Sequence, residues 1–289
     1  MTGERPRAGR GPALILVLGL LGVSAWFALG LTPSDLTPRP GGWSLAGEFL
    51  SAGLRPALDY EGGRPPGGTS FIAQLGTALH RTVIFAAAAM GLALVSGLLL
   101  GVLASSTWWS ADFWTGGSAG RRFLQRVVGP SVQAGTRVLI VLLRSIHELL
   151  WAVLFLAAFG LSTGSAVLAL AIPYAGTLAK VFSEILDEAP RESGFALRAA
   201  GAGPGRVFLF GALPHALPDM AAYGFYRFEC AVRSSAILGF FGYETLGYYL
   251  RSSFDDLHFR EVWSYLYALI ALVLILEAWS GALRRRFVA

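Results

Sequence analysis

Long, continuous runs of apolar residues alternate with shorter polar segments along the chain. Each run is close to the roughly 20 residues that an α-helix needs to cross the hydrocarbon core of a bilayer. The apolar positions do not alternate in a period of two, as they do in the strands of a membrane β-barrel. The pattern therefore predicts an all-α polytopic membrane protein with six transmembrane helices, at Pro12–Leu31, Thr82–Ser105, Val138–Phe159, Ser165–Phe182, Leu217–Phe240 and Val262–Leu283.

The amino-acid composition also indicates a membrane protein. Hydrophobic residues make up 54% of the 289 residues and charged residues only 14%, whereas an ordinary soluble domain carries about 25% charged residues. So little polar surface excludes a conventional cytosolic enzyme. The single cysteine, Cys230, excludes a disulfide within this chain. The four histidines are scattered, so the sequence predicts neither a metal site nor a catalytic residue.

The basic residues predict the orientation of the spans. If the N-terminus lies in the cytoplasm, 14 of the 23 basic residues fall on the inner side of the membrane and 6 on the outer side. Inner loops carry an excess of arginine and lysine, so both termini are expected in the cytoplasm. Three arginines precede the first run, and a cleaved signal peptide is an alternative for that run. The expected divisions are a cytoplasmic N-terminus with the first helix (1–31), a Pro/Gly-rich outer loop (32–79), a core of five helices (80–283) and a basic cytoplasmic C-terminus (284–289).

The inner segment Ser183–Pro214, between the fourth and fifth predicted spans, contains two short helical patterns. The first is Phe195–Ala200, which Gly201 is expected to end in the left-handed conformation. The second begins at Pro204, because proline fits the first turn of a helix. Two short helices with small side chains form a compact protrusion that the backbone of another protein can approach closely. The alternative is a loop that only connects two spans.

This segment resembles the EAA motif of ATP-binding cassette (ABC) importer permeases, E-A-A-x3-G-x9-I-x-L-P. Gly201, Leu213 and Pro214 fall in register with the G, L and P of the motif, and Ala196 matches its middle EAA position, with Leu197 at the third.

Two positions depart from that motif: Phe195 stands where the family has glutamate, and Gly211 where it has isoleucine. Beyond the motif, the chain resembles the phosphonate-type permeases over roughly residues 75–285. The strings that carry it are Arg144–Gly160, Ala196–Ala202, Leu213–Glu229 and Val232–Phe240.

The resemblance implies a multi-pass permease of the bacterial cytoplasmic (inner) membrane that forms a homodimer. Its implied partners are ABC ATPase subunits, a periplasmic or surface solute-binding protein and the lipid bilayer, with no nucleic acid. The residues that it assigns to ATPase coupling are Phe195, Ala196, Leu197, Arg198, Ala199, Ala200, Gly201, Leu213 and Pro214. The chain has no G-x4-G-K-[ST] phosphate-binding loop. It is therefore expected to bind no cofactor itself, with ATP and Mg²⁺ on the partner ATPase.

Ionisable residues inside the predicted spans indicate either internal struts or a solute path, because a charge near mid-bilayer needs a partner or an aqueous cavity. Arg144 and Glu148 are spaced i,i+4 on one helical face, beside His147, and Glu229 and Arg233 share the same spacing. Arg227 points about 120° away from Arg233 at 100° per residue. A partner for Arg227 is therefore expected on another span.

The three arginines outnumber the two glutamates, and this excess of positive charge favours an anionic solute. Arg233, followed by Ser234, is the favoured pathway residue, since the guanidinium fork suits phosphonate oxygens. Arg144 and Glu148 are expected to form a strut. The full set of pathway candidates is Arg233, Ser234, Arg227, Glu229, Arg144, Glu148 and His147.

The leading interpretation is the transmembrane subunit of an ABC importer for phosphonate or a related phosphorus oxyanion such as phosphite or phosphate. Three alternatives stay open. One is an ABC permease for another small solute. Another is a gradient-driven transporter that uses the intramembrane charges as a proton-coupled site. A third is a membrane-embedded enzyme built on the outer cluster Glu244, Asp255, Asp256, His258 and Glu261, for which a solvated loop is the simpler explanation.

Overall fold

A computed structural model describes residues 10–64, 68–110 and 128–287 of the chain, and no strand is found in these residues. The chain forms two compact units, Met1–Leu54 and Arg55–Ala289. Each unit is described by itself. The predicted all-α membrane architecture is confirmed.

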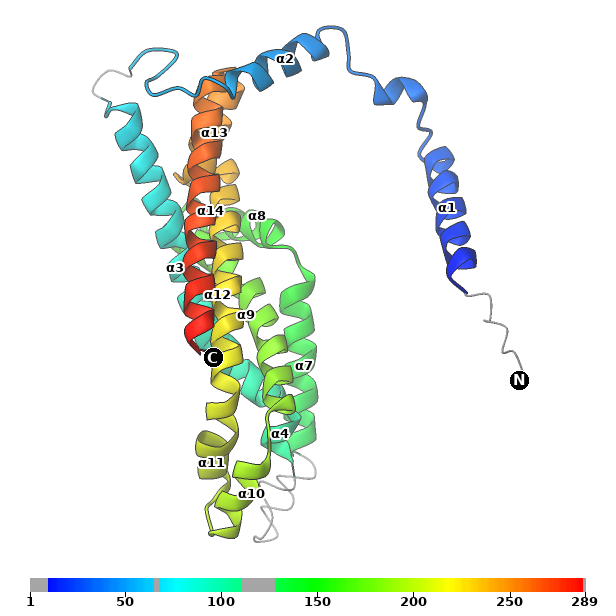
Figure 1. Cartoon of the computed structure of the whole chain (residues 1–289), viewed down its shortest axis with the longest axis vertical. Helices are drawn as coiled ribbons and strands as arrows, with labels where there is room; N and C mark the ends of the chain where they lie inside the picture. The colour runs from blue at the N-terminus through cyan, green and yellow to red at the C-terminus, as the bar shows by residue number, and fades with distance from the viewer. Residues whose placement is uncertain (1–9, 65–67, 111–127, 288–289) are drawn as a thin grey trace, which may run out of the picture. The chain divides into compact units, whose positions relative to one another are not determined.

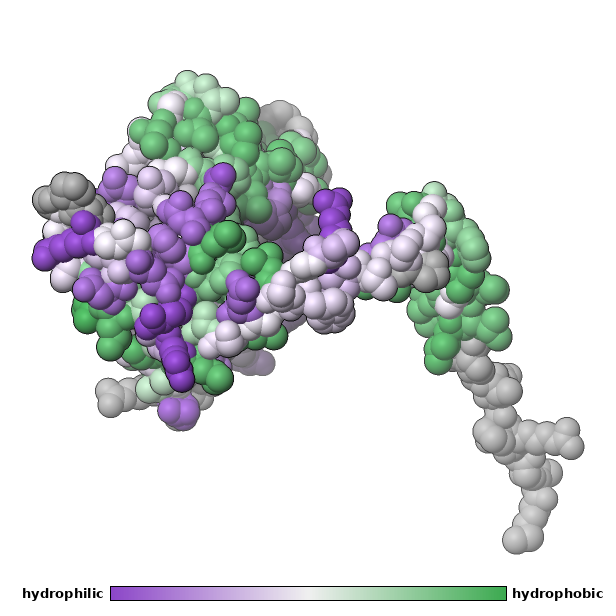
Figure 2. All heavy atoms as spheres, turned by 90° about the horizontal axis from the view of Figure 1, so that it is seen from above, coloured by the Kyte–Doolittle hydropathy of each residue, from purple (hydrophilic) through white to green (hydrophobic). Residues whose placement is uncertain are grey.

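The first unit contains α1 (Arg10–Ala28), a 3-10 turn η1 (Pro33–Leu36) and α2 (Gly42–Ala52). Helix α1 is apolar on all sides, with exposed side chains such as Ile15 and Phe27, and Figure 2 shows it covered with hydrophobic residues. A helix that is hydrophobic all round and not packed in a protein core is typical of a membrane span. Its apolar stretch, Ala13–Ala28, is shorter than the 18 residues of a full span.

The second unit is a bundle of long helices with short helices at its two ends (Figure 1). Helix α9 lies at its centre, because it packs against α3, α7, α8 and α12. Alanines such as Ala166, Ala169 and Ala175 line the buried faces of α9 and let its neighbours approach closely. The elements in chain order are α3 (Phe71–Ala104), α4 (Ser106–Trp109), α7 (Gly129–Ser145), α8 (Glu148–Phe159), α9 (Thr163–Glu188), α10 (Glu192–Ala199), α11 (Pro204–Val207), a π-helical turn η3 (Phe208–Ala212), α12 (Leu213–Ile237), η4 (Leu238–Phe241), α13 (Leu246–Asp255) and α14 (Phe259–Phe287).

Within residues 10–64, 68–110 and 128–287, three helices are long and apolar enough to cross a membrane, namely α3, α9 and α14. Helices α7 and α8 make a fourth crossing only if they are counted together, since they meet at an angle of 87°. Helix α12 is 25 residues long, which is long enough to cross a membrane. It is not apolar enough, because the sequence places several charged residues in it. Helix α3 begins at Phe71 and not near Thr82, so residues 71–79 belong to a helix and not to the outer loop.

The segment Val138–Phe159, predicted as one transmembrane helix, is divided into two helices. The backbone of Ile146 and His147 is extended, and this break separates α7 from α8. The His147 imidazole then accepts a hydrogen bond from the Leu149 N–H (3.3 Å) and caps the first turn of α8. A capping side chain satisfies one of the N–H groups that the first turn of a helix leaves unpaired, and so stabilises the break.

Helices α10 and α11 lie at one end of the second unit and α13 at the other (Figure 1). Hydrophilic residues gather on the α13 end, with hydrophobic residues at its sides (Figure 2). Hydrogen bonds hold residues 55–61 against the start of α14 at this end. The Ala57 N–H donates to the Arg260 carbonyl (3.1 Å), and the Ser264 hydroxyl donates to the Ala57 carbonyl (2.6 Å). Burial, reinforced by the Glu261 carboxylate, raises the pKa of the Tyr60 phenol in this segment. The phenol therefore stays protonated and donates a hydrogen bond to Gln74 on α3.

Candidate functional site

Helix α10 forms the centre of the segment between α9 and α12. Pro190 follows the last turn of α9, and α10 then runs over Glu192–Ala199, three residues earlier at its start than the sequence predicts. Gly201 adopts φ +83°, where its N–H donates to the Arg198 carbonyl (2.8 Å). The predicted glycine terminator and the start of the next short helix at Pro204 are both confirmed.

Helix α10 packs against η3, the turn that opens α12. The Ser193 hydroxyl donates to the Gly211 carbonyl (3.2 Å), and a Cβ atom at position 211 would lie 3.0 Å from the Gly194 Cα atom and 3.2 Å from its nitrogen. A side chain at this position would therefore collide with the backbone of α10. This close approach explains why Gly211 replaces the isoleucine of the motif.

The outer side of α10 begins with the exposed Glu192 in its first turn and then carries mostly small and apolar residues. Phe195 is 52% exposed, and Ala196, Ala199 and Ala200 are exposed beside it. Leu197 points inward and packs against the main buried cluster of the bundle. The substitution of phenylalanine for glutamate thus replaces a charged contact point by an exposed aromatic one.

On α12, the predicted pair of Glu229 and Arg233 is confirmed, with 3.1 Å between Oε1 and Nη2. The Arg233 side chain is 50% exposed, whereas that of Glu229 is 12% exposed. Arg233 therefore keeps part of its guanidinium available to a ligand while Glu229 stays against the bundle.

The predicted strut between Arg144 and Glu148 is wrong, because the break between α7 and α8 removes their helical spacing. The structure instead places Glu148 Oε1 2.9 Å from the hydroxyl of Ser234, which lies 3.0 Å from the phenol oxygen of Tyr174. His147 Nδ1 lies 3.6 Å from the other Glu148 oxygen. This cluster joins α8, α9 and α12. Arg144 is exposed, and no ion pair joins it to Glu148 in the part of the chain that the structure describes.

The predicted partner of Arg227 on another span is also wrong. Its Nε donates to the Tyr223 phenol oxygen (2.7 Å), and its guanidinium lies 5.2 Å and 5.7 Å from the ring centres of Tyr223 and Tyr226. Aromatic faces attract a cation electrostatically. Both partners lie on α12, so Arg227 is held by its own helix.

A pocket of about 480 Å³ with polar and apolar lining residues lies between α3, the start of α9 and the segment after η4. Its lining includes Arg81, Phe85, Ser162, Tyr243 and Glu244, and Arg81 forms an ion pair with Glu244 across it. Both side chains of this pair are about half exposed, so water competes for them. Among the described residues, no group of three or more His, Cys, Asp or Glu side chains is placed to hold a metal ion.

Comparison with known proteins places these features in a family. Residues 113–288, more than half of the chain, match the family described as binding-protein-dependent transport system inner membrane component. The chain belongs to this family. The resemblance to importer permeases that the sequence carries is therefore confirmed.

Two relatives are similar in sequence to about half of this chain. A phosphite transport system permease protein of Stutzerimonas stutzeri is 38% identical over 161 residues, which are 55% of this chain and 58% of the relative. A phosphate-import permease protein of Mycolicibacterium smegmatis (strain ATCC 700084 / mc(2)155) is 33% identical over 159 residues, 54% of this chain and 29% of the relative. The aligned part of this chain thus spans little more than half of the first relative and less than a third of the second.

The fold has a solved counterpart. A methionine ABC transporter in inward-facing conformations superposes with a TM-score of 0.61 at 20% identity, over 75% of this chain and 97% of that chain. The likeness is one of fold: both chains form an all-α bundle of long helices.

Sequence reasoning missed three residues of these sites. Tyr174 gives a signal in the sequence, since it is a polar residue beside Pro173 in an apolar run. Arg81 lies outside the predicted second span. Gly194 gives no signal, because its role depends on its close approach to Gly211 in another helical element.

Proposed function

We propose that the chain is the transmembrane permease subunit of an ATP-driven ABC importer in the bacterial cytoplasmic membrane. It is a transport subunit, and ATP hydrolysis takes place on separate ATPase subunits. A solute-binding protein delivers the solute on the outer side, and a second permease copy completes the path. Family membership and the arrangement of α10 support this proposal.

The observation that carries the proposal is the position of α10 between α9 and α12. Only residues 189–191 separate α10 from α9, and α10 packs directly on η3 at the start of α12. A push on α10 therefore acts on two long helices at once, and α9 is the central helix of the bundle. An ATPase bound outside the membrane can therefore use α10 to shift the bundle between two conformations. This assignment places the α10 end in the cytoplasm.

We assign the docking surface for the ATPase to the outer side of α10. Phe195 supplies an exposed ring, and the alanines around it let the partner's backbone come close. Buried aromatic side chains in a ring of small contacts are typical of the residues that carry most of the binding free energy in interfaces. In this chain the contact is hydrophobic where the motif has a carboxylate.

The solute that we propose is a phosphorus oxyanion such as phosphite, phosphate or a phosphonate. The names of the two relatives support this class. The half-exposed guanidinium of Arg233 and the exposed Arg144 supply positive charge without a fully matching negative one. Arginine binds phosphoryl oxygens with two parallel hydrogen bonds, which gives direction as well as attraction.

Reconstitution tests the proposal. The chain is co-expressed with a candidate ABC ATPase and binding protein from the same genome and placed in lipid vesicles, and uptake of radiolabelled phosphite is measured with and without ATP. We expect co-purification of the ATPase and ATP-dependent uptake of phosphite that a neutral amino acid does not compete for. Uptake by the chain alone, driven by a proton gradient, would instead identify a gradient-driven transporter. ATP-dependent uptake of another solute only would contradict the oxyanion assignment.

A further inference from the structure

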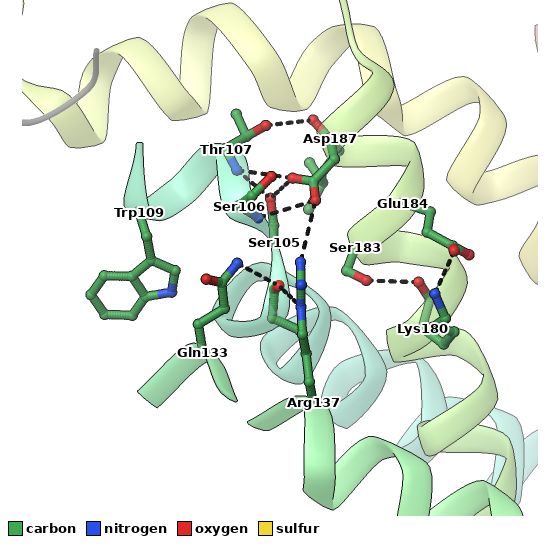
Figure 3. A network of polar contacts seen from close by, with 12 residues as sticks. Ser105, Ser106, Thr107, Trp109, Gln133, Arg137, Lys180, Ser183, Glu184 and Asp187 are labelled. Carbon is green, nitrogen blue, oxygen red and sulfur yellow. Dashed lines mark hydrogen bonds and ion pairs between the residues drawn. The ribbon is translucent and has the colours of Figure 1, made fainter. Parts of the chain in front are cut away.

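The carboxylate of Asp187 joins several chain segments at the α10 end of the bundle. Asp187 lies in the last turn of α9, and its side chain points at the junction between α3 and α4 (Figure 3). One oxygen accepts hydrogen bonds from the Ser105 hydroxyl (2.6 Å) and the Thr107 N–H (2.9 Å), and the other accepts from the Ser106 N–H (3.1 Å). The carboxylate of one helix thus caps the start of another.

The same carboxylate also reaches α7. Arg137 Nη2 lies 3.7 Å from the second oxygen of Asp187, while Arg137 Nε donates to the Ala104 carbonyl at the end of α3 (3.0 Å). Gln133, one turn earlier on α7, donates to the same carbonyl (3.2 Å). Asp187 and Arg137 therefore tie α9, α7 and the α3–α4 junction into one polar network (Figure 3).

Two routes lead from α10 into the bundle. One runs through the contact of α10 with Gly211 into α12. The other runs through Pro190 into the end of α9, where Asp187 lies three residues before that proline. Helix α4 meets both routes, because Asp187 caps it and the ring of Trp108 packs edge-on against Phe208 of η3, with 4.9 Å between ring centres.

The polar network differs in kind from the apolar packing above it. Apolar contacts are non-directional. Hydrogen bonds to a carboxylate are directional and roughly twice as strong as those between neutral groups. A movement at the end of α9 is therefore passed on to α3, α4 and α7 with a fixed geometry.

We propose that Asp187 is a positioning residue that couples the movement of α10 to α3, α4 and α7 during transport. This inference rests on the proposed function, in which a partner ATPase moves α10. In this proposal, the Asp187 carboxylate makes α3, α4 and α7 move together with α10 when the ATPase moves α10.

The test uses the full transporter in vesicles and compares wild type with Asp187→Asn. Asparagine has nearly the same shape, but it loses the charge that Arg137 pairs with and one of the two accepting oxygens. We expect the ATPase to co-purify in wild-type amounts and to hydrolyse ATP, while solute moved per ATP falls at least about fivefold, the lower end of measured coupling between sites. Asp187→Glu, which keeps the charge, is expected to recover part of this ratio.

Glu184→Gln is the matched control. Glu184 lies one turn earlier on α9 and pairs with Lys180 on the same helix, with both side chains about half exposed. The ratio of solute to ATP is expected to stay at the wild-type value in this variant.

Two results would overturn the inference. The first is an unchanged ratio in Asp187→Asn. The second is an equal fall of uptake and hydrolysis that tracks the amount of folded protein, which indicates a merely structural role. If Asp187→Asn does not fold, Ser105→Ala decides, because it removes one donor and keeps the carboxylate; an unchanged ratio there rejects the proposal. A wild-type chain that fails to co-purify with the ATPase would contradict the proposed function instead.

Discussion

Replacing Gly211 by isoleucine, the residue of the EAA motif, is expected to loosen α10 from the bundle. At this position even a Cβ atom would lie 3.0 Å from the Gly194 Cα atom. Carbon atoms in good contact are about 3.5–4.0 Å apart, so α10 must retreat by at least about 0.5 Å. The movement also stretches the hydrogen bond from Ser193 to the Gly211 carbonyl, which is already 3.2 Å long.

The cost of this overpacking is about 1–3 kcal/mol, because backbone atoms and not a flexible side chain meet the new group. Since each 1.4 kcal/mol is a factor of ten, α10 would open about 5- to 140-fold more often in Gly211→Ile. Amide hydrogen exchange measures such local opening directly. The expected result is faster exchange of the amides in Glu192–Ala199 by that factor, with exchange in the centre of α9 unchanged.

Gly205→Ile is the matched control. Gly205 lies in α11, and a Cβ atom there meets nothing within 4 Å. Exchange of the α10 amides is expected to stay at the wild-type rate in this variant. Wild-type exchange in Gly211→Ile, or equal acceleration in both variants, would refute the reasoning that Gly211 is required by the approach of Gly194.

Three further variants probe separate parts of the chain. Phe195→Ala should weaken ATPase binding by about 30-fold, the effect of losing a hot spot worth about 2 kcal/mol, with an unchanged melting temperature because the ring is 52% exposed; normal ATPase affinity in a pull-down titration would argue against α10 as the docking helix. Arg233→Ala should lower phosphite uptake at least about tenfold, since a charge-assisted hydrogen bond is worth about 1.5–3 kcal/mol, while ATPase co-purification persists; undiminished uptake would remove Arg233 from the path. Arg81→Ala should change the free energy of unfolding by less than about 1 kcal/mol, because both partners of its ion pair are about half exposed; a larger loss in thermal unfolding would show that this pair is a structural tie.

Sequence patterns predicted the helical segments and the form of the segment between α9 and α12, because these depend on local signals. Pro190, Gly201 and Pro204 act on their immediate neighbours, and the structure places each at the end or start of a helix as expected. The long apolar runs similarly mark α3, α9 and α14, with boundaries that shift by a few residues, or by eleven at the start of α3.

The break between α7 and α8 was not predictable from local signals. The run through Ile146 contains no proline or glycine, so its periodicity is that of one helix. The break is capped locally by His147, and it brings Glu148 at the start of α8 to Ser234, 86 positions away in the sequence. Long-range contacts of this kind decide which intramembrane charges pair, and for that reason the strut between Arg144 and Glu148 was mispredicted.

The same reason explains Gly211 and Asp187. In the sequence, Gly211 is only a departure from a motif, and Asp187 is an acidic residue near the end of a helix. Their functions follow from Gly194, 17 positions before Gly211, and from Ser105, 82 positions before Asp187. A close approach between backbones and a cap supplied by a distant helix leave no periodic pattern to read.

Crosslinking from α10 tests the central claim, that this helix is where an external ATPase acts on the bundle. In a chain freed of its only cysteine by Cys230→Ser, Ala199→Cys carries a short crosslinker on the exposed side of α10 and leaves Phe195 in place. Tyr248→Cys, on α13 at the opposite end, serves as the control. Within the assembled transporter, we expect a crosslink to the ATPase from position 199 and none from position 248. A crosslink to the ATPase from position 248 but not from position 199 would contradict the claim.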